Sequence, residues 1–542
     1  MKPFIQSHNV YLTPLSPIHI GCGEDFEPTN YVIDSETLFN FEPSHLMLNE
    51  RERTNLLNAV NKDILAIHNF FSSNKSKIIP LSQYFSAITK GFVSEYNKNI
   101  ENPAHKEKNG NKVFNQLQIE RTAYLPYQGL AFIPGSSFKG AFTTPLLSKR
   151  HIDNGGNPLI KREKKTSKTA LSLISQKINE DYLYNINNLK SFDEVKENFA
   201  HNEFRSIKFS DFSPLNNVQT KIFYCLNFNR ELKNGEKTFN TKIVQRRESI
   251  LPGQYRAFSA NLSILDDKVN KLLSLNEYLT INNSYYKKIF IEEMEDLVAK
   301  GFVSQNYLND ILNIINKGGF LIRLGKNGSD SKVLKGKNVA QIEIKPKKNQ
   351  EVYYQDKATT YWLSADSKTQ KNNLLPFGWA LIEVDPTTEN EALKTWCEAQ
   401  PKSKFDRSEI LAKREAQKAE QARLQAEAEA KRLAEQQAEK EKLALLDSLS
   451  DNQRLVEAKL VEWNSQERKP FTVSPIFSEA KKLLEDAQQW NKEDRHYLYE
   501  KLDPTKSNEG LQKYVDGLNG FSNLKAKSAV EFKKLRNKLV TE

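Results

Sequence analysis

Cysteine is scarce in this chain of 542 residues, and Cys22, Cys225 and Cys397 stand far apart. Three widely spaced thiols supply neither a disulfide framework nor the clustered ligands of a zinc site, so we expect no metal or other cofactor. Long apolar runs are also missing, since none approaches the roughly 20 residues that a membrane span needs. The first residues lack the apolar core of a signal peptide. The sequence therefore predicts a cytoplasmic protein that does not associate with membranes.

Glycine is absent from one long segment, between Gly378 and Gly510. Within it, residues 407–446 consist almost entirely of Ala, Glu, Lys, Gln, Arg and Leu, which are good helix formers. We expect a helix of about forty residues, roughly 60 Å long at 1.5 Å per residue. Its leucines do not keep a heptad register, so the pattern favours a single solvated helix over a coiled-coil dimer.

The sequence on either side of this helix follows two different patterns. Toward the N-terminus, short strand-like runs such as 31–34 and 320–324 alternate with helical patterns such as 51–71 and 287–302. Near the C-terminus, apolar residues recur with helical periodicity in three or four segments. We therefore predict an α+β region over residues 1–385, a helical linker over 386–450 and a small all-α accessory or docking domain over 451–542.

The chain is basic, with 79 Lys and Arg against 68 Asp and Glu, a net charge of +11. Residues 401–542 hold 28 of these basic and 25 of these acidic residues, a net of +3. The remaining 51 basic and 43 acidic residues give the first 400 residues a net of +8. Such an excess fits a polyanionic partner, and it places most of that attraction in the α+β region.

The segment TPLSPIHIGCGEDFEP, residues 13–28, is the first candidate site. His19 alternates with two isoleucines, which places its side chain on the opposite face of an extended chain. Gly21 and Gly23 permit close approach of a ligand or another backbone. They do not complete a dinucleotide fingerprint, because no helical pattern and no third glycine follow. His19 could act as a general base in RNA cleavage, although a lone histidine is more often structural.

The segment FIPGSSFKGAF, residues 132–142, is the second candidate. A turn of small residues precedes a helical pattern, and we expect Ser136 or Ser137 to be the N-cap of a helix that starts near Phe138. The N-terminus of that helix would attract an anion such as phosphate, and Lys139 would add a positive charge. The residue order differs from that of a nucleotide-binding P-loop. On this segment alone, a capped turn without a ligand fits as well as a phosphate site.

Basic residues cluster downstream of this segment. Lys149 and Arg150 follow within about three helical turns, and residues 161–168 carry five further cations. A second basic stretch extends from Arg323 to Lys337. Aromatic residues near these clusters could stack on bases, as in proteins that bind single strands without reading their sequence. The pattern favours a sequence-tolerant RNA groove.

Three segments in this order resemble the RAMP superfamily of CRISPR-associated proteins: LTPLSPIHIGCGE, FIPGSSFKGAF, and FLIRLGKNGS followed by LLPFGWALIEV. The resemblance covers residues 1 to 385, and it is strongest to the type III-A effector subunit at the 3′ end, or head, of the guide-RNA filament. It implies a ferredoxin- or RRM-like domain with helical and hairpin insertions. It also implies a non-catalytic subunit that binds the 3′ part of the guide RNA (crRNA) backbone, caps the filament of RAMP subunits, and supports crRNA maturation and antiviral defence.

The resemblance implies partners as well as a fold. These are the guide RNA, a neighbouring RAMP backbone subunit and, as a further candidate, target RNA. The helical extension from residue 386 onward lies outside the family pattern. It could contact another subunit, dimerise or recruit a trimming nuclease.

The matched segments and the basic residues beside them give a set of predicted RNA-binding residues. The late segment has fewer glycines than the family usually shows, which makes its role the least specified of the three. Two other classes remain open: a metal-independent RAMP endoribonuclease that processes guide RNA with His19 as general base, and a coiled-coil scaffold. The predicted RNA-binding residues are His19, Gly21, Gly23, Ser136, Ser137, Lys139, Gly140, Lys149, Arg150, Arg323, Gly325, Lys326 and Gly328.

Overall fold

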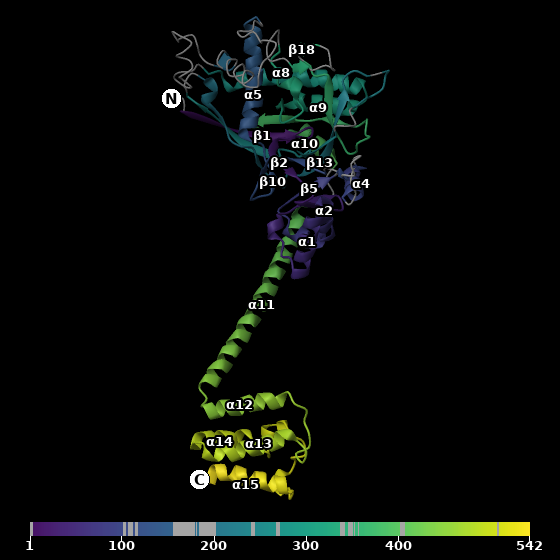
Figure 1. The fold of residues 1–542 in the computed structure, drawn as a ribbon. Coiled ribbons are helices and arrows are strands. Elements are labelled where there is room, and N and C mark those ends of the chain that lie inside the picture. Colours follow the sequence, from purple (N-terminus) through teal and green to yellow (C-terminus); the bar gives the residue numbers. More distant parts are fainter. Residues whose placement is uncertain are drawn as a thin grey trace. The chain divides into compact units, whose positions relative to one another are not determined.

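The described part of the chain forms two compact units, residues 1–418 and 419–542 (Figure 1). Within it, no helix is both long enough and apolar enough to cross a membrane. The computed structural model describes residues 4–100, 105–106, 112–113, 117–155, 179, 182–183, 202–232, 234–239, 244–266, 272–335, 342–344, 351, 353–355, 357–401, 407–506 and 509–541.

The first sheet of the N-terminal unit has a ferredoxin-like arrangement. Its strands run in the order β11-β15-β1-β21-β16, with β12 also beside β15, and all its pairings are antiparallel. Helix α5 (Gly135–Asp153) lies between β1 and β11 in the chain, and α8 (Leu275–Ala299) follows β15; the two helices pack together and contact β11 and β16 (Figure 1). The predicted α+β fold is therefore confirmed. The strands are β1 (Ile5–Pro14), β11 (Ile207–Phe209), β12 (Ser213–Pro214), β15 (Phe258–Leu265), β16 (Phe320–Arg323) and β21 (Trp379–Val384).

A second, larger sheet draws many of its strands from the long insertion between β1 and α5. Its order is β2-β8-β14-β13-β5-β4-β3, with β19 beside β13 and β20 beside β19. Two pairings, β13 with β5 and β14 with β8, are parallel. The strands are β2 (Gly21–Phe26), β3 (Tyr31–Asp34), β4 (Thr37–Asn40), β5 (Tyr84–Ile88), β8 (Ile119–Thr122), β13 (Thr220–Asn229), β14 (Gln245–Ile250), β19 (Thr360–Ala365) and β20 (Leu375–Pro376).

The segment between β1 and β2 joins the two sheets. Leu15 N–H donates to Trp379 O in the first sheet at 2.9 Å. Ile18 and Ile250 exchange backbone hydrogen bonds of 3.2 and 2.8 Å at the second sheet. Both Leu15 and Ile18 are fully buried in the main hydrophobic core. The first candidate motif is thus fixed between the sheets. Its two glycines, Gly21 and Gly23, lie at the start of β2.

The expected helical patterns are present, but two of their boundaries differ. Residues 51–71 form two helices rather than one, because Asp63 ends the first helix and its side chain accepts a hydrogen bond of 2.9 Å from Ala66 N–H in the second. The pattern at 287–302 is the second half of α8, which starts at a capping box of Ser274 and Glu277. The other helices of this unit are α1 (Glu50–Lys62), α2 (Ile64–Ser73), α3 (Lys75–Ile78), α4 (Lys90–Asn99), α9 (Gln305–Lys317) and α10 (Glu391–Ala399). Three short strand pairs complete it: β6 (His105–Lys106) with β7 (Lys112–Val113), β9 (Tyr124–Leu125) with β10 (Leu130–Ala131), and β17 (Ile342–Ile344) with β18 (Tyr353–Gln355).

The contact between α5 and α8 repairs a defect in the α5 hydrogen-bond ladder. Pro145 lies inside α5 and has no N–H, so the carbonyl of Ala141 loses its helical donor. The hydroxyl of Tyr286, a buried residue of α8, donates to that carbonyl at 2.8 Å. The side-chain amide of Asn282, one turn earlier on α8, donates to Phe142 O at 3.2 Å. These two bonds fix the position of α5 along α8.

The long helix and the C-terminal bundle form as expected. Helix α11 (Arg407–Asp447) matches the predicted helix at 407–446. Its first turns belong to the N-terminal unit, where Ile410 and Leu411 pack on a small core and Arg414 donates to Ser82 O at 2.6 Å. The C-terminal unit has its own hydrophobic core, centred on side chains such as Trp463 and Phe532. Its bundle helices are α12 (Asp451–Asn464), α13 (Pro475–Asp486), α14 (Lys492–Lys501) and α15 (Lys527–Thr541).

We predict that Tyr286→Phe lowers the free energy of unfolding of the N-terminal unit by about 1–3 kcal/mol, because it leaves the Ala141 carbonyl buried without a donor. The same change in a Pro145→Ala background should cost much less, since the alanine would supply the missing N–H. Calorimetry of the full-length chain measures this double-mutant cycle, with the C-terminal unit as internal reference. Equal costs in both backgrounds would show that the hydroxyl does not compensate for the proline.

Candidate nucleic-acid interface

Three segments that are far apart in the sequence line one cavity of about 440 Å³. The first segment enters β2, the second is the start of α5, and the third follows β16. Among the described residues that line it, the charged side chains are three cations, with no Asp or Glu. The lining residues are Ile20, Gly21, Ser136, Ser137, Gly140, Ala141, Thr144, Tyr286, Arg323, Leu324, Gly325, Lys326, Ser331 and Lys332.

The loop that follows β16, here called the late loop, crosses directly over the first motif (residues 13–28). Two glycines allow this close approach. Gly325 has a φ of +77°, and a Cβ there would overlap the carbonyl oxygen of His19. Lys326 N–H donates to the same oxygen at 3.0 Å. Gly378 has a φ of +96°, and a Cβ there would overlap the carbonyl oxygen of Leu324. Side chains at these positions would be strained and would separate the segments.

The start of α5 differs from the predicted cap. The helix begins at Gly135, with Pro134 as N-cap, and neither Ser136 nor Ser137 caps it. Asp211 takes that role, because its carboxylate accepts a hydrogen bond of 2.7 Å from Gly135 N–H. A Cβ at position 135 would lie 2.6 Å from the backbone carbonyl oxygen of residue 210, so only glycine permits this early start.

The two serines consequently remain available to a ligand. The N–H groups of Ser137 and Phe138 donate to Pro134 O at 2.9 and 3.2 Å. Within the described residues, the N–H of Ser136 and the hydroxyls of Ser136 and Ser137 have no hydrogen-bond partner. Both serines line the cavity at the positive end of the helix dipole.

Lys139 is turned away from the cavity. Its ammonium group donates to the carbonyl oxygens of Phe204 at 2.6 Å and Ile207 at 3.2 Å. Burial lowers the pKa of Lys139, and the nearby charge of Lys208 lowers it further. The side chain therefore fastens α5 to the segment that leads into β11, and it is not among the residues that line the cavity.

Arg323 forms part of the cavity wall, but its charge is neutralised. The side chain is buried, with 4% of the residue's surface exposed. One terminal nitrogen donates to both carboxylate oxygens of Glu293 at 3.0 Å, and the Trp379 indole N–H donates to the same carboxylate at 2.8 Å. The guanidinium also lies 5.0 Å from the Trp379 ring centre. This network fixes the end of β16 beneath the late loop.

One carboxylate, that of Glu120, gathers three basic side chains beside the cavity. Lys326 Nζ donates to Glu120 Oε2 at 2.6 Å, and Arg247 donates to both oxygens at 3.0 and 3.1 Å. His19 Nε2 lies 3.5 Å from Oε2. Burial raises the pKa of Glu120, but the bonds from His19, Arg247 and Lys326 outweigh it and hold the pKa well below its usual range. An ionised Glu120 thus keeps Lys326 at the cavity edge.

Glu120 and Lys326 also line an adjoining cavity of about 500 Å³, together with Gly21 and Gly23. This second cavity includes the acidic side chains of Glu24 and Asp25 as well as basic ones. Its charge is therefore mixed, which makes it less suited to a polyanion than the first.

The other predicted residues lie outside both cavities. The ammonium group of Lys149 pairs with Asp153 at 2.9 Å, on the exposed surface of α5. Arg150 pairs with Glu203 at 2.6 Å. Gly328 packs against the Arg323 side chain, where a Cβ would lie 2.8 Å from Nε. The basic segment 161–168 lies outside the described residues.

Lys332 lines the cavity but was not among the predicted RNA-binding residues. It lies in the basic stretch from Arg323 to Lys337, and no single motif distinguishes it there. Unlike Arg323 and Lys326, it has no ion-pair partner among the described residues. Burial of its ammonium group and the charge of Arg323 both lower its pKa, which a bound anion would reverse. Lys332 therefore provides the cavity with a positive charge that is not paired with a carboxylate in the described part of the chain.

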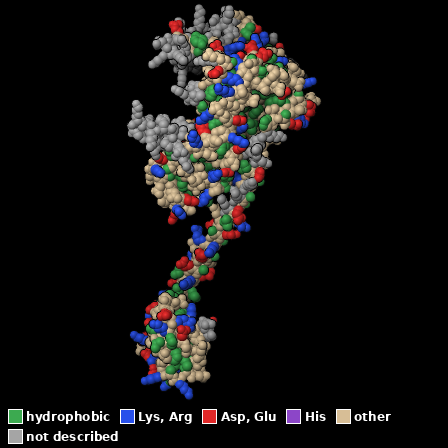
Figure 2. Space-filling model, turned by 90° about the vertical axis from the view of Figure 1, so that its right-hand side faces the viewer, with side chains coloured by type: hydrophobic (Ala, Val, Ile, Leu, Met, Phe, Trp, Pro, Cys, Tyr) green, Lys and Arg blue, Asp and Glu red, His purple; other side chains and the backbone are tan. Residues whose placement is uncertain are grey.

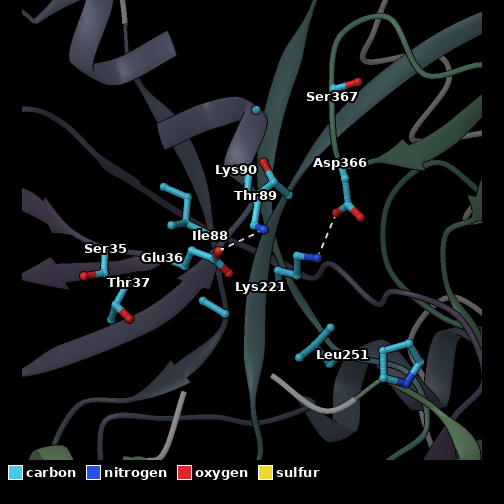
Figure 3. A pocket seen from close by; sticks show the side chains of 13 residues that line it. Ser35, Glu36, Thr37, Ile88, Thr89, Lys90, Lys221, Leu251, Asp366 and Ser367 are labelled. Carbon is cyan, nitrogen blue, oxygen red and sulfur yellow. Dashed lines mark ion pairs between the residues drawn. The ribbon is translucent and has the colours of Figure 1, made fainter. Parts of the chain in front are cut away.

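A larger cavity of about 690 Å³ lies near the N-terminus of α4 (Figure 3). Its charges are balanced in pairs: Lys221 lies 2.8 Å from Asp366, and Lys90 lies 3.7 Å from Glu36. Figure 3 draws both pairs among the side chains that line it. This cavity is a weaker candidate for a polyanion than the smaller one described above.

The comparisons with known proteins identify a family. The model of the RAMP superfamily matches residues 11–329 of the chain. No curated protein matches the sequence.

Two solved structures are similar to the chain. One is a subunit of a cryo-EM structure of a Csm–crRNA–target RNA ternary complex of a type III-A CRISPR-Cas system, with 15% identity, a TM-score of 0.39, and coverage of 70% of this chain and 100% of that one. The other is the crystal structure of T. onnurineus Csm5, with 16% identity, a TM-score of 0.37, and coverage of 69% and 99%. Their low TM-scores mean that neither likeness establishes a function.

We predict that Lys139→Met lowers the free energy of unfolding of the N-terminal unit by about 2 kcal/mol, because two carbonyl oxygens lose a charged donor. Lys149→Met, at an exposed position about three turns further along the same helix, should have little effect. Calorimetry of the full-length variants measures both. Unchanged stability of Lys139→Met would mean that the ammonium group is not needed for the fold.

Proposed function

The chain belongs to the RAMP superfamily, and on this premise we propose that it is a non-catalytic RNA-binding subunit of a type III CRISPR effector complex. It would bind the 3′ part of the guide RNA through the backbone and cap the filament of RAMP subunits. In that position it would support crRNA maturation and antiviral defence. The observation that carries the proposal is the cavity lined by cations, hydroxyls and glycines from three separate segments, with no carboxylate among the described residues that line it.

The cavity has the chemistry of a phosphate site. Lys332 supplies a charge without an ion-pair partner among the described residues, and Lys326 supplies a second one that Glu120 holds at the edge. The N–H of Ser136 and the two serine hydroxyls offer neutral donors at the start of α5. Gly140 leaves open space on the outer side of the helix, since nothing described lies within 4 Å of a Cβ built there. Such contacts recognise the sugar-phosphate chain and are indifferent to base identity.

The remaining partners follow from this role. A subunit at the end of a filament packs against one neighbouring RAMP subunit, and target RNA paired to the guide would pass the same surface. The exposed α11 and the C-terminal bundle could serve as a docking site for a further component, such as a trimming nuclease. All of these partners are cytoplasmic in this proposal.

The environment of His19 favours a structural role over catalysis. Only 1% of this residue is exposed, and Nδ1 donates to the carbonyl oxygen of Glu248 at 2.7 Å. The other nitrogen, Nε2, faces Glu120, and His19 is not among the lining residues of either cavity. A general base must reach the proton it removes, and His19 would have to leave its buried position to do so. A scaffold role for α11 is supported only by its length and exposure.

We predict that Lys326→Gln and Lys332→Gln each weaken the binding of single-stranded RNA, and that the double variant lowers the slope of log affinity against log salt by about 1.4, or about 0.7 for each lost phosphate contact. Fluorescence anisotropy with a labelled oligonucleotide at several salt concentrations measures the slope. Lys149→Gln, which removes one exposed charge outside the cavity, is the matched control. A slope equal to that of the wild type in the double variant would exclude the cavity as a phosphate site.

We further predict that the purified chain does not cut guide-repeat RNA, and that His19→Ala behaves like the wild type. Denaturing gels of labelled repeat RNA, incubated with and without chelator, provide the measurement. Defined products that the His19→Ala variant fails to make would establish the endoribonuclease alternative instead.

A further inference from the structure

The C-terminal helix α15 carries a straight row of exposed lysines. Lys527, Lys534 and Lys538 are separated by seven and four residues, which places them within about 40° of one another at 100° per residue. All three are exposed, whereas Phe532 and Leu539 on the other side of the helix are buried in the bundle core. The row extends over about 16 Å at 1.5 Å per residue. Figure 2 shows basic side chains gathered along this edge of the C-terminal unit.

Some cations of the bundle have acidic partners among the described residues, whereas those of the row have none. Elsewhere in the unit, Lys459, Lys501 and Lys506 each pair with a glutamate. None of the three row lysines has an ion pair with another described residue.

Glu531 is the one acidic residue in the sequence of α15, and it lies on the same face as the row. Glu531 lies between Lys527 and Lys534 in the helix, and their charges help to lower its pKa. Its carboxylate, however, is already paired with Lys481 of α13 at 2.5 Å, which is the largest cause of that lowered pKa. The row therefore presents a net positive charge that the fold does not compensate.

The chemistry of the row fits the backbone of a nucleic acid better than a protein or a membrane. Lysine is depleted in protein–protein interfaces, which rely on aromatic and arginine anchors, and the row contains none. A helix that lies on a membrane exposes a wide apolar face, whereas the large apolar side chains Phe532 and Leu539 of α15 point into the bundle. Flexible ammonium groups spaced along a line suit successive phosphates, which they can follow without reading the bases.

We infer that Lys527, Lys534 and Lys538 form a second RNA-binding surface, which contacts the phosphate backbone without sequence preference. This surface lies beyond residues 11–329, which match the family model. It does not depend on the cavity of the N-terminal unit, since the two sites share no residue. A chain with both surfaces would hold a longer stretch of RNA than the cavity alone.

The test compares full-length variants that lose the same charge in different places. The row variant is Lys527→Gln, Lys534→Gln and Lys538→Gln. The control variant is Lys431→Gln, Lys440→Gln and Lys442→Gln, three exposed lysines of α11 that have glutamates close by in the sequence. A single-stranded RNA of about 40 nucleotides, without repeat sequence, is long enough to reach several phosphates at each site. It is titrated by anisotropy at several salt concentrations, and circular dichroism verifies that each bundle is folded.

The row variant should lower the slope of log affinity against log salt by about 2, which is about 0.7 for each of three phosphates. Its affinity should then change about 16-fold less than that of the wild type over a fourfold rise in salt. The control variant should keep the wild-type slope. A row variant with the wild-type slope overturns the inference, as does an equal loss in both variants, which would indicate an effect of net charge alone.

The same titration separates this inference from the proposed function. In the Lys326→Gln, Lys332→Gln background, the row variant should remove about 2 further units of slope, because the two surfaces bind separate phosphates. If the cavity variant has no effect and the row variant does, the row binds RNA and the cavity does not. If the row variant adds nothing in either background, the row makes no contact with RNA.

Discussion

The hydrogen bond from Lys326 N–H to the carbonyl oxygen of His19 brings the parts of the candidate site together. It requires that the loop after β16 lie flat on the segment that enters β2, and Gly325 makes this approach possible. The helix α5 then closes the third side, with its own start set by Gly135 and Asp211. If the loop moved away, Lys326 would leave its carboxylate partner, and the cavity would lose both its edge and one of its charges.

Among the residues that the structure describes, carboxylates lie beside the cavity but do not line it. Glu293 neutralises Arg323 from the buried side, and Glu120 holds Lys326 from the adjoining cavity. This arrangement gives each cation a defined position while leaving the lining itself positive or neutral. A phosphate that entered would compete with Glu120 for Lys326, but no described carboxylate would compete with it for Lys332. Glu293 and Glu120 therefore position the cations, and the cations themselves line the cavity.

The sequence is informative about elements and less so about the direction of side chains. Strand patterns, the long helix and the C-terminal bundle follow from periodicity and composition, which act locally. The convergence of Gly21, Ser136 and Lys326 is foreseen only through the family resemblance, because nothing local indicates that segments three hundred residues apart meet. The predicted cap of α5 is wrong because a carboxylate from another segment, Asp211, bonds the first N–H of the helix. The sequence predicts a ligand contact for Lys139 because it does not reveal which carbonyl oxygens lie within reach of the ammonium group.

The distance along the chain between the segments of the cavity also sets an order of events during synthesis. His19 leaves the ribosome about 300 residues before Lys326, which corresponds to roughly 15 to 60 s at 5–20 residues per second. Until then the first motif and α5 exist without the loop that completes the cavity. A truncated or nascent chain thus lacks the full set of residues that line the cavity. If the proposed function holds, only chains translated past the late loop could bind a guide through the complete cavity.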